Sequence, residues 1–206
     1  MKNTAYVIVD VQNDFIEGGA LGVNGGARVA QSITDYVEEF GHLFQALVTT
    51  QDWHLDSPEH IALWGAHCMA GTSGSSLYYS LAQLLSPKDP EERRFNDILV
   101  PIIKGLYDHG YSGFSGKVDN YYPEEVNEDI SLESVLRWRK IERLIIVGLA
   151  TDHCVRATAL DALDLGYEVV IFADQIAGVN TDASDAARAE IASKGGIITT
   201  SKEFVL

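Results

Sequence analysis

Cysteine and basic residues are scarce in this sequence of 206 residues. Its two cysteines, Cys68 and Cys154, are too few for a disulfide framework in a chain of this length. Only 15 Lys and Arg stand against 30 Asp and Glu, so the formal net charge is −15. Nucleic acids and anionic membranes carry the same sign of charge and would repel such a chain. We therefore expect neither of them as a partner.

Long hydrophobic runs are also absent. No apolar stretch approaches the roughly 20 residues that span a bilayer. The N-terminal segment MKNTAYVIVDV lacks the longer apolar core and the small-residue cleavage site of a secretory signal, so we expect a cytoplasmic location. The hydrophobic content of 46% and the charged content of 22% are ordinary for a globular protein. The length suits one domain, residues 1–206.

Short β-branched runs alternate with longer amphipathic stretches along the chain. The pattern predicts strands at 5–11, 43–50, 98–104, 143–150, 168–174 and 197–200, and helices at 27–41, 75–85, 131–140, 152–166 and 181–196. This alternation is typical of the α/β class: a single doubly wound domain with a central six-stranded parallel sheet and helices on both faces. Pro101 favours an edge position for its strand. Residues 86–97 are interpreted as a polar surface excursion.

Chemically reactive side chains follow four of the predicted strands. They are Asp10, then Asp52 with His54, then Lys104, and finally Cys154. In an open parallel sheet, ligands bind beyond the carboxyl ends of the strands, at the point where the strand order reverses. We therefore expect these side chains to meet at one site.

Asp10, Lys104 and Cys154 combine an acid, a base and a nucleophile. We expect Cys154 in the first turn of a helix capped by Thr151 or Asp152, where the helix dipole would stabilise a thiolate. An aspartate can take the thiol proton, and a lysine can keep that aspartate ionised. The alternatives are structural: a buried cysteine that packs as a small hydrophobe, an aspartate that caps a loop, and a solvated lysine at a strand end.

The segment QDWHLDSPEH, residues 51–60, concentrates residue types that bind metals. Asp52 and His54 are two positions apart, so in an extended chain both side chains face the same way. His60 follows after a turn at Ser57 and Pro58. Such a segment either solvates the end of a strand or coordinates a metal.

Five motifs together resemble a known family. YVIVDVQNDFIEGGAL, QDWHLDSPEH, WGAHCMAGTSG, KGLYDHGYSGF and VGLATDHCVRATALDAL resemble motifs of the isochorismatase-like cysteine hydrolases, and within that superfamily those of the nicotinamidases. The resemblance runs from the first predicted strand to the final IITT. It implies a hydrolase that deamidates nicotinamide to nicotinate and ammonia, and pyrazinamide to pyrazinoate, through a thioester intermediate in NAD salvage.

The same resemblance implies a role for each motif residue. The catalytic triad would be Asp10, Lys104 and Cys154. The backbone amides of Ala150 and Cys154 would form an oxyanion hole after a cis peptide bond between Leu149 and Ala150. The walls of a pocket for a flat pyridine ring would be Phe15, Trp64 and Tyr111. One divalent transition metal would have the ligands Asp52, His54, His60 and His67, a donor set that suits zinc, iron or manganese.

The chain departs from the family pattern at Gly65. This glycine stands where relatives commonly have a proline, in Trp64-Gly65-Ala66-His67-Cys68, and it frees the backbone before His67.

Three other functions are alternatives. A related amidohydrolase could act on a carbamoyl, ureido or other small amide, but such a substrate offers a metal no ring nitrogen. Isochorismatase itself does not need the cysteine, and a silent binding protein would not need an intact triad. The sequence leaves the oligomeric state open.

Overall fold

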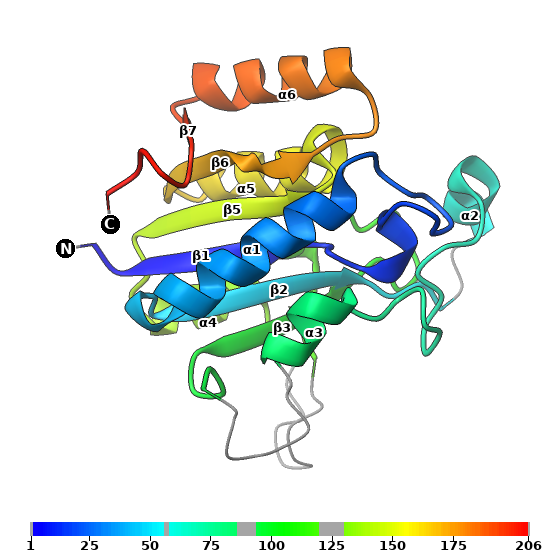
Figure 1. Cartoon of the computed structure of the whole chain (residues 1–206), viewed down its shortest axis with the longest axis horizontal. Coiled ribbons are helices and arrows are strands. Elements are labelled where there is room, and N and C mark those ends of the chain that lie inside the picture. Colours follow the sequence, from blue (N-terminus) through cyan, green and yellow to red (C-terminus); the bar gives the residue numbers. More distant parts are fainter. Residues whose placement is uncertain (1, 56–57, 86–93, 120–129, 206) are drawn as a thin grey trace.

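The structure is built around a seven-stranded sheet (Figure 1). The computed structural model describes residues 2–55, 58–85, 94–119 and 130–205. The strands are β1 (Thr4–Val9), β2 (Ala46–Asp52), β3 (Leu99–Lys104), β4 (Lys117–Val118), β5 (Arg143–Leu149), β6 (Glu168–Ala177) and β7 (Ile197–Thr199). Their order in the sheet is β4-β3-β2-β1-β5-β6-β7, and only β3 and β4 pair antiparallel. The six predicted parallel strands are confirmed, and β4 is an addition.

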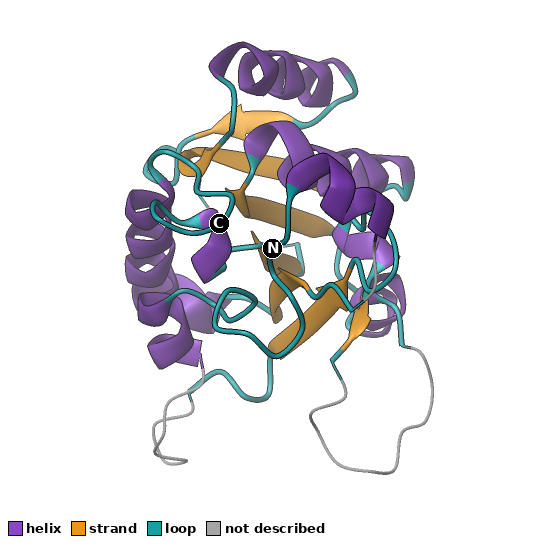
Figure 2. Cartoon of the chain, turned by 90° about the vertical axis from the view of Figure 1, so that its right-hand side faces the viewer, coloured by secondary structure: helices purple, strands orange, loops and turns teal. Residues whose placement is uncertain are grey.

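The helices cover both faces of this sheet (Figure 2). They are α1 (Gly26–Phe40), α2 (Pro58–Trp64), α3 (Tyr79–Leu85), α4 (Leu132–Trp138), α5 (Arg156–Asp164) and α6 (Thr181–Ser193). Shorter turns of helix are η1 (Asn13–Phe15), η2 (Gly41–Leu43), η4 (Gly113–Ser115) and the π-helical turn η5 (Thr151–Val155). In the described residues, none of the helices has the length and apolar character that crossing a membrane requires.

Strand β1 shows why the strands are continuously apolar. Tyr6 and Ile8 pack into the core layer under α1 and α3, whereas Val7 and Val9 pack into the layer under α4 and α5. Successive side chains of a strand point to opposite faces, so a strand covered on both faces has no position left for a polar residue. No residue of β1 is charged, and Asp10 follows directly after the strand.

Two short elements differ from the sequence prediction. Pro101 lies one strand in from the edge, because β4 pairs with Ile102 and Ile103 of β3. Strand β4 has only two residues, too few to show a periodic pattern in the sequence. The helix α2 replaces the loop expected around His60. Of the predicted excursion over 86–97, residues 86–93 lie outside the described part of the chain.

The strand order reverses between β1 and β5. From β1 the chain moves outward to β2 and β3, then returns to β5 on the other side of β1 and continues to β6 and β7. Such a reversal separates the loops that leave the two central strands and opens a crevice beyond their carboxyl ends. Asp10 directly follows β1, and η5 with Cys154 follows β5, so both residues lie at this crevice.

Candidate active site

Three fully buried side chains meet at the crevice between β1 and β5. The Nζ atom of Lys104 lies 2.7 Å from Oδ2 of Asp10 and 3.6 Å from Sγ of Cys154. The exposed fractions of these residues are 0% for Asp10 and Lys104 and 6% for Cys154. The structure thus brings together the three residues expected as a triad, from the ends of three different strands.

Lys104 also forms an ion pair with Asp52, its register partner on β2. One ammonium therefore serves two buried carboxylates. Burial raises the pKa of Asp10, and the charge of Asp52 adds to this effect, while Lys104 only partly opposes it. Burial by itself would lower the pKa of Lys104, but the two carboxylates outweigh it and raise that pKa well above its usual value. Thr50 further fixes Asp10, because its hydroxyl donates a hydrogen bond to Oδ1 at 2.6 Å.

The thiol of Cys154 is not the pre-formed thiolate that a helix N-terminus predicts. Burial raises its pKa well above the usual value, and the charges of Asp10 and Asp52 add to this, against the opposing effect of Lys104. The chain around Cys154 forms the π-helical turn η5, whose N-cap residue Ala150 makes no side-chain capping bond. A carboxylate oxygen of Asp10 lies within 4.8 Å of the thiol sulfur. The sulfur is therefore protonated at rest and has a base beside it.

The expected cap residue Asp152 has a different task. Its carboxylate accepts hydrogen bonds from the backbone N–H groups of Val179 and Asn180, each at 3.0 Å. It thereby ties the turn that carries Cys154 to the start of α6. The peptide bond between Leu149 and Ala150 is cis, as expected.

Three buried histidines form a second cluster next to the triad. One ring nitrogen of each of His54, His60 and His67 lies within 4.8 Å of the other two. His54 Nδ1 donates to the carbonyl of Gly105 at 2.5 Å, whereas its buried Nε2 has no hydrogen-bond partner among the described residues. Buried polar atoms almost always have a partner, so this orphaned nitrogen points to a missing cation. The residues fit a transition-metal ion.

The electrostatics of the cluster suit a metal as well. Burial, followed by the neighbouring histidines, lowers the pKa of His60 to about 4, and burial also lowers the pKa of His67. The imidazoles of His60 and His67 are therefore neutral at pH 7, which is the form that binds metals. Burial favours a higher pKa for Asp52, but Lys104 and His54 outweigh it and lower the value, so this carboxylate stays charged. Its Oδ2 lies 3.8 Å from Nε2 of His54.

Gly65 explains how His67 reaches the cluster without the usual proline. Its φ is +81°, a left-handed conformation that proline cannot adopt because its ring holds φ near −65°. The carbonyl of Gly65 accepts a hydrogen bond from Nδ1 of His67 at 2.8 Å. The backbone of this loop therefore follows a path of its own and still directs Nε2 of His67 toward His60.

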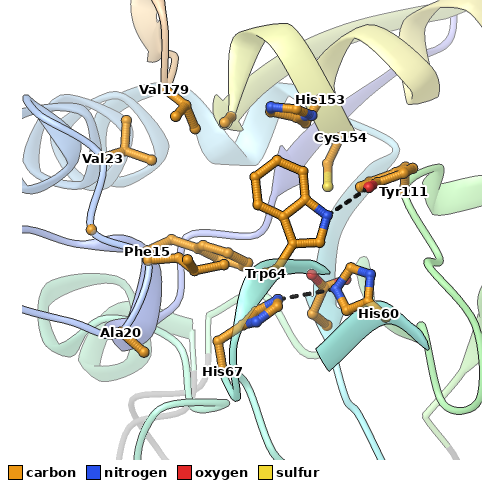
Figure 3. Close-up of a pocket in the computed structure, with 14 residues that line it drawn as sticks. Phe15, Ala20, Val23, His60, Trp64, His67, Tyr111, His153, Cys154 and Val179 are labelled. Atoms are coloured by element: carbon orange, nitrogen blue, oxygen red, sulfur yellow. Dashed lines mark hydrogen bonds between the residues drawn. The ribbon is translucent and has the colours of Figure 1, made fainter. Parts of the chain in front are cut away.

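A pocket of about 280 Å³ is lined by Cys154 of the triad and by His60 and His67 of the cluster (Figure 3). Its wall contains the three aromatic residues expected there, Phe15, Trp64 and Tyr111, together with Ala150, Cys154, Asp52, His60, His67, His153, Val179 and residues 20–23. The indole N–H of Trp64 donates to the hydroxyl of Tyr111 at 3.0 Å. A volume at the lower end of ligand pockets suits a small ring compound.

Sequence reasoning did not identify His153 as a pocket residue. Its ring stands edge-on to Trp64, with the ring centroids 5.1 Å apart. The available signal was its place in the motif TDHC, because the residue before a buried nucleophile in a tight turn faces the same crevice.

Comparisons with known proteins agree with this geometry. Residues 109–203 match the model of the Isochorismatase domain family. A nicotinamidase/pyrazinamidase of Mycobacterium tuberculosis is 38% identical over 194 residues, which cover 91% of this chain and 93% of that protein. The crystal structure of pyrazinamidase of Pyrococcus horikoshii in complex with zinc has 30% identity and a TM-score of 0.73, with 96% of this chain and 99% of that chain covered.

A further similar structure is that of PnC1 from L. infantum in complex with nicotinate. It has 28% identity and a TM-score of 0.79, and the match covers 99% of this chain and 96% of that chain. The similarity to the mycobacterial protein extends over 91% of this chain. The chain therefore belongs to the isochorismatase-like hydrolases, within the family of nicotinamidases and pyrazinamidases.

Proposed function

We propose that this protein deamidates nicotinamide to nicotinate and ammonia, and pyrazinamide to pyrazinoate, in cytoplasmic NAD salvage. The observation that carries the proposal is the buried group of Asp10, Lys104 and Cys154 directly beneath a pocket with aromatic walls. Similarity to a nicotinamidase/pyrazinamidase of M. tuberculosis and to a protein crystallised with nicotinate supports this choice of substrate. The flat pyridine ring would lie among Phe15, Trp64 and Tyr111.

The reaction begins with a proton transfer to Asp10. The carboxylate takes the proton of Cys154 while Sγ attacks the carboxamide carbon, and the carbonyl oxygen becomes an oxyanion. Backbone N–H groups of Ala150 and Cys154 stabilise that oxyanion, each by about 3 kcal/mol. Lys104 keeps Asp10 ionised before the transfer and balances the negative charge that the sulfur acquires.

The second half of the reaction reverses the proton transfer. Asp10 gives its proton to the amide nitrogen, the C–N bond breaks, and ammonia leaves a thioester on Cys154. A water molecule then attacks the thioester carbon and loses a proton to Asp10. When the C–S bond breaks, nicotinate leaves and the proton returns to Sγ, which restores the starting state.

We propose Asp52, His54, His60 and His67 as the ligands of one zinc, iron or manganese ion. The zinc complex of the P. horikoshii pyrazinamidase and the orphaned Nε2 of His54 support this assignment. When bound, the ion supplies a positive centre that orients the pyridine nitrogen, directly or through water. The protein's own contribution is to hold Asp52, His60 and His67 in the wall of the pocket, with His54 beside the two other imidazoles.

The decisive experiment is ammonia release from nicotinamide, measured on purified protein before chelation, after it, and after each metal is restored. We expect release to fall on chelation and to return with metal. Cys154→Ala should abolish release, whereas Cys68→Ala, which removes the other buried thiol, should retain it. Ammonia release by Cys154→Ala would show that Cys154 is not the nucleophile. If the folded protein releases no ammonia from nicotinamide with any metal, its substrate is another small amide.

A further inference from the structure

The three histidines of the cluster share one arrangement. In each ring, Nδ1 has a partner outside the cluster. His54 Nδ1 bonds to the carbonyl of Gly105 and His67 Nδ1 to the carbonyl of Gly65, whereas His60 Nδ1 lies 2.7 Å from Nδ1 of His109. The inward nitrogens of His60 and His67, both Nε2, are 3.2 Å apart (Figure 3). Each ring is therefore held by one nitrogen while the other faces the cluster.

His60 depends on a different kind of partner from the other two. A backbone carbonyl only accepts hydrogen bonds, so Gly105 and Gly65 force a proton onto Nδ1 of their histidines and leave Nε2 with a lone pair for a metal. The partner of His60 is instead a histidine side chain, which accepts at Nδ1 in only one of its tautomers. Of the three histidines, His60 is therefore the one whose outer hydrogen bond a substitution of the partner residue would remove.

The loop after β3 holds His109 in place. Its ring stacks in parallel on Tyr111, with centroids 5.6 Å apart and planes 1° apart. The neighbouring Gly110 has a φ of +54°, and an added Cβ there would lie 2.2 Å from the backbone nitrogen of Gly105. This tight packing brings the loop across His60, although His109 itself is exposed on its outer side.

The contacts of His109 also join two separate segments. His60 and Trp64 are four residues apart on α2, so they face the same side of that helix. Each contacts the loop after β3: His60 through His109, and Trp64 through its hydrogen bond to Tyr111. Helix α2 stands apart from the layers that cover the sheet (Figure 1), and these two contacts join it to the loop after β3.

We propose that His109 is a positioning residue for the metal: by accepting a hydrogen bond from Nδ1 of His60, it fixes the tautomer and the orientation that direct Nε2 into the cluster. This inference rests on the proposed metal site and adds a residue to it. His109 is not itself a ligand, because its Nδ1 faces His60 and not the space between the three imidazoles.

The test separates the acceptor atom from the aromatic ring. His109→Asn keeps an acceptor near the position of Nδ1 but removes the ring. His109→Phe keeps a ring that stacks on Tyr111 but removes the acceptor, and His109→Ala removes both. The full chain is stripped with a chelator, and the dissociation constant for Zn²⁺ is measured by competition with a chromophoric chelator. Thermal unfolding of the metal-free variants checks that each is folded.

We expect His109→Phe and His109→Ala to weaken zinc binding by about 10- to 100-fold, as losses of outer partners of metal ligands do. His109→Asn should remain within about threefold of the unaltered chain. If His109→Phe binds zinc as tightly as the unaltered chain and His109→Asn binds it more weakly, His109 acts through the packing of its ring and the proposal is wrong. Equal affinity in all three variants, or equal loss in Asn and Phe, would also overturn it.

The same measurement distinguishes this inference from the proposed function. If the unaltered chain and His54→Ala bind zinc equally weakly, the metal site itself is wrong. If the unaltered chain binds zinc tightly through His54 while all His109 variants match it, only the role of His109 is wrong.

Discussion

The triad and the histidine cluster lie side by side and are equally buried, yet they satisfy their charges in opposite ways. In the triad, one lysine serves two carboxylates, so protein atoms alone complete the site. In the cluster, three imidazoles face one another, and Nε2 of His54 has no hydrogen-bond partner among the described residues. Burial therefore favours two opposite outcomes: internal ion pairs where the protein supplies a cation, and an external cation where only bases are present.

Asp52 belongs to both regions. One of its oxygens pairs with Lys104, and the other lies 3.8 Å from Nε2 of His54. Because Lys104 holds this carboxylate ionised and in place, a change in the triad can reach the cluster through Asp52. Variants that affect one region and spare the other therefore test the comparison directly.

The largest effect is expected from Asp10→Asn, which removes the proton acceptor and leaves the cluster untouched. An amide cannot take the thiol proton, so the turnover number for nicotinamide should fall by about 10⁴-fold, as for other members of catalytic triads. Zinc affinity should fall far less than the turnover number, because Asp10 is not a proposed metal ligand and reaches Asp52 only through Lys104. A loss of activity below tenfold, or a matching loss of zinc affinity, would contradict the separation of the two regions.

Lys104→Met should affect both regions, because it leaves the carboxylates of Asp10 and Asp52 buried without a cation. Removing one partner of a buried ion pair costs about 3–5 kcal/mol of the free energy of unfolding. Denaturant unfolding measures this loss. The control is Lys2→Met, which breaks the surface pair with Glu168, where the lysine is 46% exposed. That change should stay within about 0.5 kcal/mol, and equal losses in the two variants would show that Lys104 is not the balancing cation.

Zinc should stabilise the metal-free protein through the histidine cluster. A ligand that binds only the folded state at 100 times its dissociation constant adds about 2.7 kcal/mol to the free energy of unfolding. This gain should vanish in His54→Ala, which removes the orphaned nitrogen, and persist in His42→Ala, which changes an exposed histidine. Unfolding of each variant with and without zinc gives the difference. If zinc still stabilises His54→Ala, the cation binds at another site.

A further effect concerns the pH dependence of the metal-free protein. Burial, followed by the neighbouring histidines, lowers the pKa of His60 from 6.5 to about 4. Between these values the unfolded chain binds a proton at His60 and the folded chain does not, so the free energy of unfolding should fall as pH drops through this window. Urea unfolding across the window measures the slope. His60→Gln should reduce the slope of the free energy of unfolding against pH. An unchanged slope would show that other groups take up the proton.

The sheet and the residues at its carboxyl edge could be predicted from the sequence alone. The strands are buried on both faces, so each appears as an apolar run, and Asp10, Asp52, Lys104 and Cys154 stand out where these runs end. Parallel strands bring such ends together, which is why residues far apart in the chain could be assigned to one site. The metal ligands and the pocket walls came from the resemblance to a family, because their spacing alone left a solvated loop as an alternative.

Only the tertiary structure decided the state and the surroundings of these residues. The raised pKa of the Cys154 thiol depends on burial and on carboxylates from two other strands, neither of which its own helix reveals. Short elements such as α2 and β4 owe their conformation to contacts with distant segments more than to local periodicity. The contact of His109 with His60 likewise joins positions 49 residues apart. Local sequence sets periodicity and strand ends, whereas burial, charge pairing and orientation depend on atoms that only folding brings close.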